Sequence, residues 1–349
     1  MIMRISTLIL VLLLPVCTHA VVVHDLYQAE VPVPDQSAAS QKQGLSSAML
    51  QVLIKVTGDR NIRGRAVADE LIKKPENYLQ QYKYRKKPVI ENNQLTLEEQ
   101  LYLWASFNES AINRVLNEYA VPVWGKVRPS TLVWLVVDSG ESPRIVGLED
   151  VSGYSAMLEK SARERGIVLV HPLLDETDLG YLTTSDIKAG FVDRVITASE
   201  RYSADSTLAG TVTQTGENSW QAEWSAIIAD NVSTWTVTGD SVAAVLEDGV
   251  NRLTDNLAER YVHTSTYTEE TGIEIVVNDI HGFDQYSRVL KYLRSLNSVT
   301  DVQVLSVKPG NVTYSISSSG GDLAIQRAIE LGQTLESLSG SGSPYRLLN

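Results

Sequence analysis

Apolar and polar residues alternate along Ser206–Gly239, and this period predicts three antiparallel strands joined by two tight turns. In the middle run every second residue is apolar: Trp220, Ala222, Trp224, Ala226 and Ile228. Threonines dominate the other face of the meander, where β-branched side chains suit strands. Because one face of this sheet is apolar, we expect helices from the flanking sequence to cover it.

The sequence around the meander predicts a middle unit over residues 129–268 with the order βαβαβββα. The run Thr131–Asp138 is almost continuously apolar, as in a strand that is covered on both faces. Helical spacing predicts one helix over residues 187–202, before the meander, and another over Ser241–Tyr261, after it. The unit should therefore pack helices against a mixed sheet.

A first α+β unit is predicted over residues 21–128. It begins with a strand over Val21–Val33 and continues with an amphipathic helix that ends at Gly58. A basic strand and a further strand around Leu95–Phe107 follow, and a helix over Ser110–Tyr119 closes the unit.

A third unit, over residues 269–349, reads as βαββαβ, a split ferredoxin-like arrangement. The turn Pro309-Gly310-Asn311 separates its two central strands, and a strand near Tyr345–Leu348 would complete it. The Ser-Gly run over residues 337–343 could equally be a loose linker to a frayed tail. The fold class expected for the whole chain is therefore α+β, built from three small α/β units.

The N-terminal residues 1–20 have the layout of a secretory signal peptide: Arg4, an apolar run over Ile5–Leu14, and cleavage near Ala20. An apolar run this short does not span a bilayer, which needs about 20 residues. Cys17 follows a valine instead of a small residue, which argues against lipidation. We expect a periplasmic protein without a transmembrane segment after cleavage.

Charge and cysteine content restrict the partners and the chemistry. The formal net charge is −12, and loss of Arg4 with the signal peptide makes it −13. This sign argues against nucleic acid and anionic lipid headgroups as the main partners. Cys17 is the only cysteine, so the mature chain would have no disulfide, no cysteine nucleophile and no cysteine metal ligand.

The sequence contains no recognisable catalytic or cofactor-binding pattern. The four histidines after the signal peptide are not spaced to converge on a metal: His24, His171, His263 and His281. There is no G-x-S-x-G elbow, no Walker pattern and no dinucleotide fingerprint. We therefore expect a non-enzymatic protein without a cofactor or a metal.

One strand is strongly polarised. Lys83, Arg85 and Lys87 share one face, and Tyr82 and Tyr84 share the other. The basic face could dock an acidic protein or an anionic glycan. The alternative, which the pattern favours, is an edge strand whose charges protect it from aggregation.

The acidic loop Asp175-Glu176-Thr177-Asp178 is a second candidate docking site. It lacks the alternating acids and the distant glutamate of a calcium loop, so no calcium site is predicted. Asp178 is also typical of a turn before a helix. A role in contacting an envelope partner stays open.

Four segments carry a resemblance to known proteins: SSAMLQVLIKVTGD, HPLLDETDLGYLTTSDI, ASERYSADSTLAGTV and WQAEW. Together they resemble a family of Gram-negative secreted proteins known only as a domain of unknown function. The resemblance implies a periplasmic location and carries over no catalytic residue. The element order of the middle unit is also similar to the TolB N-terminal domain and to periplasmic activators of penicillin-binding proteins, a likeness of topology alone.

These observations predict a non-catalytic periplasmic protein that binds or scaffolds an envelope component, either a protein or something associated with peptidoglycan. The alternative is a periplasmic enzyme or small-ligand-binding protein whose site lies in a cleft between the units. Neither the partner nor the stoichiometry follows from the sequence.

Overall fold

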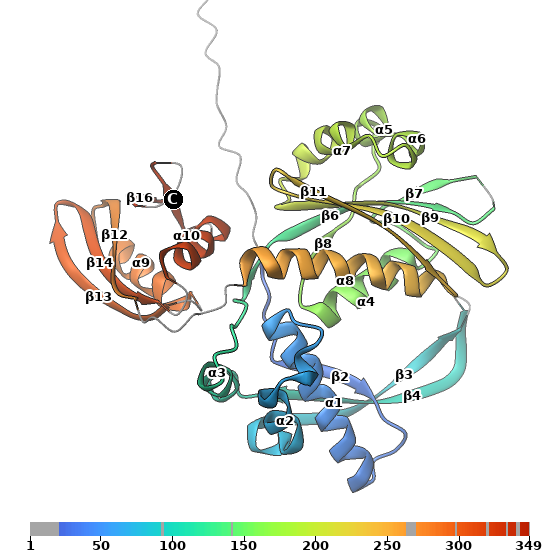
Figure 1. The fold of residues 1–349 in the computed structure, drawn as a ribbon, viewed down its shortest axis with the longest axis horizontal. Helices are drawn as coiled ribbons and strands as arrows, with labels where there is room; N and C mark the ends of the chain where they lie inside the picture. The colour runs from blue at the N-terminus through green and yellow to red at the C-terminus, as the bar shows by residue number, and fades with distance from the viewer. Residues whose placement is uncertain are drawn as a thin grey trace, which may run out of the picture.

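The computed structural model describes residues 21–91, 94–140, 142–262, 270–296, 299–318, 321–332, 334–339 and 343–348. These residues form an α+β fold of three units (Figure 1). The predicted signal peptide with Cys17, His263 and part of the Ser-Gly run lie outside them. In the described part of the chain, no helix combines the length and the apolar character needed to cross a membrane.

The first unit contains an antiparallel sheet of order β2-β4-β3, with α1 on one face (Figure 1). Its elements are β1 (Val21–Val22), β2 (Gln28–Pro32), α1 (Ala38–Thr57), η1 (Ile62–Gly64), α2 (Ala66–Lys73), η2 (Pro75–Tyr78), β3 (Leu79–Glu91), β4 (Gln94–Phe107) and α3 (Glu109–Glu118), and β1 pairs with β5 (Val127–Arg128). The helix predicted to end at Gly58 is confirmed as α1. The single strand predicted over Val21–Val33 is wrong, because the chain turns between β1 and β2. Lys55 holds this turn by donating to the carbonyls of Asp25 and Gln28.

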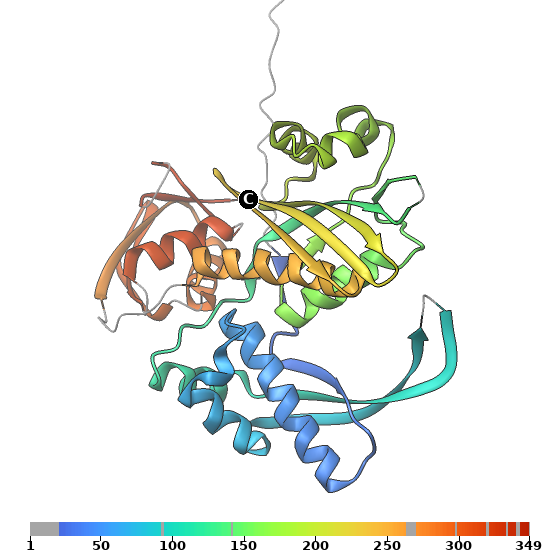
Figure 2. The same ribbon diagram turned by 45° about the vertical axis from the view of Figure 1, so that its right-hand side comes forward.

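The second unit contains a six-stranded sheet of order β11-β10-β9-β6-β7, in which β8 also pairs with β6. Its elements are β6 (Ser130–Asp138), β7 (Arg144–Val146), α4 (Tyr154–Arg165), β8 (Val168–Val170), α5 (Glu176–Tyr181), α6 (Thr184–Lys188), α7 (Val192–Ser199), η3 (Glu200–Tyr202), β9 (Ser206–Gly216), β10 (Ser219–Ile228), β11 (Asn231–Gly239) and α8 (Val242–Tyr261). Figures 1 and 2 show α4 and α8 on one face of the sheet and α5–α7 on the other. The buried character predicted for β6 is confirmed.

The order βαβαβββα is present in the second unit, with two differences. The short strand β7 was not predicted, because three residues are too few for a periodic signal. The single helix predicted over residues 187–202 is divided into α6, α7 and η3, and α5 precedes them. Gly190 causes the break between α6 and α7, since its φ of +69° is left-handed and cannot continue a right-handed helix.

The meander is confirmed in detail. Trp224 of β10 lies opposite Gly210 of β9 and Trp235 of β11. The apolar residues predicted for one face of β10 pack into the core under α8. The period of two in the sequence therefore identifies both the strands and their buried face.

The third unit contains a five-stranded sheet of order β13-β14-β12-β16-β15. Its elements are β12 (Glu270–Ile280), α9 (Phe283–Ser295), β13 (Val299–Lys308), β14 (Gly310–Ser318), α10 (Gly321–Leu331), β15 (Leu335–Ser337) and β16 (Tyr345–Leu347). The expected βαββαβ order is present, with β15 added between α10 and the final strand. That strand, β16, runs parallel to β12 and antiparallel to β15.

Candidate functional site

The predicted basic residues lie on the face of the first sheet that points away from α1. Lys83, Arg85 and Lys87 are exposed on β3, which is an edge strand, as expected. In register, Lys83 lies opposite Trp104 of β4 and Arg85 lies opposite Tyr102. We call this surface the basic-aromatic face, and its residues are Glu30, Lys83, Arg85, Lys87, Tyr102 and Trp104.

The cations of the basic-aromatic face are ordered by the aromatic rings beneath them. Lys83 Nζ lies 4.6 Å from the Trp104 ring centroid, and Arg85 Cζ lies 5.7 Å from it. Lys87 Nζ lies 5.2 Å from the Tyr102 ring centroid. At these distances the ring quadrupole attracts a cation, so the charges are held flat along the sheet.

One carboxylate partly neutralises this face. Glu30 of β2 pairs with both Arg85 and Lys87. No carboxylate of the described residues lies within ion-pair distance of Lys83. Two of the three cations therefore share a single anion, and the face keeps an excess of positive charge on a chain whose net charge is strongly negative.

Tyr82 and Tyr84 lie on the opposite side of the sheet from the basic residues, as predicted. Tyr84 packs against the core of the first unit, and its ring meets that of Tyr82 edge to face at 6.1 Å. Tyr82 is 44% exposed. The aromatic residues of the basic-aromatic face are instead Tyr102 and Trp104, which sequence reasoning missed although they alternate with the buried Leu103 and Ala105.

Two of the three carboxylates in the acidic loop, those of Asp175 and Asp178, make internal contacts. Asp175 accepts a hydrogen bond from the Asp178 amide at the start of α5 and pairs through both oxygens with Arg201, at 2.7 and 2.9 Å. The hydrogen bond from Arg201 lowers the pKa of Asp175 to about 2. Asp178 is buried and accepts from the Leu174 amide, Arg201 and the Tyr202 hydroxyl. These carboxylates hold α5 against η3, and Asp178 exposes nothing to a partner.

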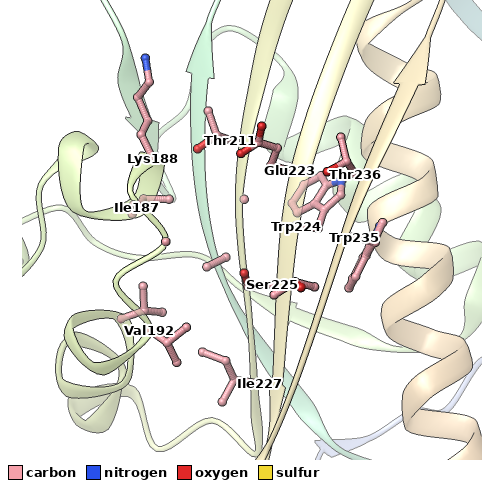
Figure 3. A pocket seen from close by; sticks show the side chains of 15 residues that line it. Ile187, Lys188, Val192, Thr211, Glu223, Trp224, Ser225, Ile227, Trp235 and Thr236 are labelled. Atoms are coloured by element: carbon pink, nitrogen blue, oxygen red, sulfur yellow. The ribbon is translucent and has the colours of Figure 1, made fainter.

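A groove of about 340 Å³ lies over the outer face of the meander (Figure 3). Its walls come from the α6–α7 connection on one side and from β9, β10 and β11 on the other. Glu223 supplies a carboxylate, and Lys188 supplies an ammonium group that pairs with Asp138 at 2.8 Å. The lining residues include hydroxyls of Thr211, Ser225 and neighbouring threonines but no histidine. A carboxylate, an ammonium group and several hydroxyls can bind a polar ligand.

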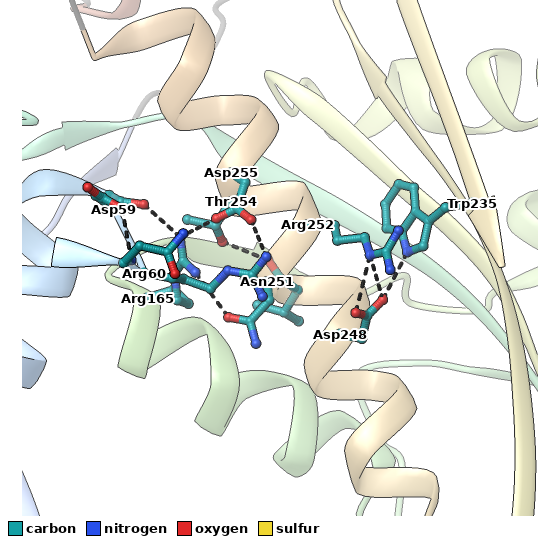
Figure 4. A network of polar contacts seen from close by, with 12 residues as sticks. Asp59, Arg60, Arg165, Trp235, Asp248, Asn251, Arg252, Thr254 and Asp255 are labelled. Carbon is teal, nitrogen blue, oxygen red and sulfur yellow. Dashed lines mark hydrogen bonds and ion pairs between the residues drawn. The ribbon is translucent and has the colours of Figure 1, made fainter. Parts of the chain in front are cut away.

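A polar network joins the first unit to the second (Figure 4). Arg165, at the end of α4, donates to the Gly58 carbonyl at 2.8 Å, to Asp255 at 2.8 Å and to Asn251 at 3.1 Å. Arg60 also pairs with Asp255. The end of α1 is therefore tied to α4 and α8, and the basic-aromatic face is fixed relative to the second unit.

The histidines do not assemble a metal site in the described residues, where no three His, Cys, Asp or Glu side chains are grouped to hold an ion. His171 is buried, and its Nε2 lies 3.1 Å from Glu159 Oε1. This pair joins the residue that follows β8 to α4, and its two residues are 12 positions apart in the sequence. Sequence spacing alone had indicated no partner for His171.

Comparisons with known proteins identify a domain but no activity. Residues 20–125 match a family model described as a domain of unknown function (DUF8605), and this range includes the basic-aromatic face. No curated protein matches the chain. Lipoprotein GNA1162 from Neisseria meningitidis is 16% identical over 38% of this chain and 99% of its own, with a TM-score of 0.23. An uncharacterized protein of known structure is 13% identical over 38% and 97%, with a TM-score of 0.16.

Proposed function

We propose that this chain is a non-catalytic periplasmic protein that binds an anionic envelope component through the basic-aromatic face. The observation that carries the proposal is the row formed by Lys83, Arg85 and Lys87, three exposed cations ordered over two aromatic rings. The rest of the chain is acidic, so this row is a local exception that would orient an approaching anion.

The geometry favours an acidic protein segment over a glycan as the partner. Cations on alternate residues of a strand are about 7 Å apart, which matches alternate residues of an extended acidic chain. A sugar would need a free aromatic surface on which to stack, but Lys83, Arg85 and Lys87 already lie over Trp104 and Tyr102.

Charge reversal tests the proposal. Replacing Lys83, Arg85 and Lys87 together with Glu should leave the far-UV circular dichroism unchanged and abolish retention of the partner after in-cell crosslinking and affinity purification from envelope extracts. The matched control replaces Lys42, Lys73 and Lys74, which are exposed on α1 and at the end of α2, with Glu. It changes the net charge equally and should keep the partner.

Salt provides the second measurement, because exposed charges are screened at high ionic strength. Retention by the natural sequence should fall when the salt concentration is raised to about 0.5 M. If the triple Glu variant retains the same partner as the control variant, the face serves only to protect an edge strand.

Export is tested separately: the N-terminus of the protein recovered from the periplasm should lie near Val21.

A further inference from the structure

The strand β11 is an open edge of the six-stranded sheet. Among the described strands it pairs only with β10, and its register runs from Asn231 to Gly239 without a bulge. Its nine residues, NVSTWTVTG, include no charge and no proline. Charged residues, prolines and bulges on an edge strand block pairing with other chains. Natural edge strands usually have one of these features or are very short.

The other described edges are protected in one of these ways. β3 carries three lysines, an arginine and Pro88. β13 contains Asp301 and Lys308, and its register shifts twice against β14. β7 and β15 have three residues each. The unprotected length of β11 is therefore a distinctive property of this edge.

The backbone of β11 is available for pairing. A two-residue turn joins β10 to β11 and places Ile228 opposite Asn231, with Ala229 at a φ of +51°. In such a hairpin the closing pair is hydrogen-bonded, so alternate residues from Val232 onward direct their N–H and C=O groups outward. In the part of the chain that the structure describes, Thr234 and Thr236 make no backbone hydrogen bond to another element, and both are exposed.

The charges around β11 specify what can pair with it. Asp230 and Asp240 are exposed at its two ends, and Glu223 of β10 is exposed opposite Thr236 on the same sheet face. A second copy pairing antiparallel about Trp235 would place Asp230 of one chain beside Asp240 of the other, which is unfavourable. A strand with basic residues at its ends would instead meet opposite charges.

We propose that β11 docks an extended segment of a partner protein, which adds to the sheet as its next strand. The segment is rich in β-branched residues and has Lys or Arg at both ends and one basic residue near its middle, beside Thr236. That side chain lies across Thr236 and reaches Glu223, which is two strand spacings or about 10 Å away. The groove beside Ser225 and Thr234 leaves space for it (Figure 3).

A synthetic peptide tests this site without knowledge of the natural partner. The probe is a fluorescein-labelled peptide of about eleven residues, enough to cover β11 at about 3.4 Å per residue, with alternating Thr and Val, Lys at both ends and Arg in the middle. Its control has Glu in place of Lys and Arg. Fluorescence anisotropy with the full mature chain at low salt should show binding of the basic peptide alone.

Variants separate backbone pairing from charge. Thr236→Pro removes an outward N–H while leaving the bonds to β10, so we expect affinity to fall by about tenfold. Thr236→Lys, which blocks the edge by charge, should weaken binding in the same direction and serves if the proline variant does not fold. Glu223→Gln should cost about two- to fivefold, as for an exposed ion pair. The control Glu217→Gln, in the β9–β10 turn, should change nothing.

Three results would overturn the proposal. The first is equal affinity of the natural sequence and both folded Thr236 variants for the basic peptide. The second is equal binding, or equal absence of binding, of the basic and acidic peptides. The third is concentration-dependent dimerisation in sedimentation velocity that Thr236→Lys abolishes, because a second copy would then occupy the edge.

Discussion

Gly249 of α8 and Gly210 of β9 enclose the indole of Trp224, and we predict that Gly249→Ala destabilises the second unit. A Cβ at Gly249 would lie 2.5 Å from the Trp224 ring, and one at Gly210 would lie 2.2 Å from it. Trp224 is 2% exposed, so its ring has no space into which it can move. Two opposing effects then decide the sign of the change.

Alanine in place of glycine inside a helix ordinarily stabilises by about 1 kcal/mol. Overpacking a filled core costs about 1–3 kcal/mol, and the upper part of that range applies when the neighbour is a rigid ring. Since a contact of 2.5 Å requires the indole or α8 to move, overpacking should prevail. We expect Gly249→Ala to lower the free energy of unfolding by about 1–2 kcal/mol.

Urea unfolding followed by tryptophan fluorescence measures this change. The matched control is Gly180→Ala in α5, where a new Cβ meets no atom within 4 Å, and which should keep or raise stability. Trp224→Phe in the Gly249→Ala background should recover part of the loss, giving a favourable coupling in a double-mutant cycle. If Gly249→Ala is as stable as the natural sequence or more so, the close packing of α8 on Trp224 is refuted.

Two further predictions concern buried charges. Burial lowers the pKa of Lys55 from 10.5 to about 8, which means that the folded state disfavours the charged form of this lysine. This penalty is complete below pH 8 and is relieved as the pH rises toward 10.5. The free energy of unfolding should therefore increase across that window by up to about 3 kcal/mol relative to Lys55→Met. Parallel curves of unfolding free energy against pH for the two proteins would contradict this prediction. Asp178→Asn should lower the free energy of unfolding in urea by about 1–3 kcal/mol, because it weakens the buried acceptor of Arg201 and Tyr202. It should also hasten proteolysis within α5–α7, and an unchanged rate of proteolysis would contradict this prediction.

The elements that the sequence predicts well are those whose periodicity extends over several turns or strand pairs. The meander and α1 were expected because their buried faces repeat every two residues or every three to four. The α5–α7 segment was not resolved into its parts, since helices of five to eight residues are set by Gly190 and by caps such as Thr183. The boundaries of these short helices depend on single residues, and a periodic pattern of apolar positions does not reveal them.

The sequence alone does not identify all residues of the basic-aromatic face, because they come from three different strands. Alternation identified the face shared by Lys83, Arg85 and Lys87, but not the rings beneath it. Trp104 and Tyr102 come under these cations only through the register of β3 against β4, and Glu30 only through the pairing of β2. A register change of one residue would exchange the two faces of β4, so composition alone could not identify the aromatic members.

Buried cations order the end of α1, and one of them, Arg165, joins the first two units in a way that the sequence did not indicate. Lysine and arginine are normally treated as surface residues, yet Lys55, Arg128 and Arg165 are each less than 5% exposed. Arg128 donates to the Lys55 carbonyl and Arg165 to the Gly58 carbonyl, at the end of α1 where helical carbonyls lack partners. Lys55 and Arg128 find their acceptors within the first unit, whereas moving the units apart would take the Gly58 carbonyl away from Arg165, which is costly for a buried cation. The basic-aromatic face and the β11 edge are therefore held in a fixed relation, and a partner that binds both must match the distance between them.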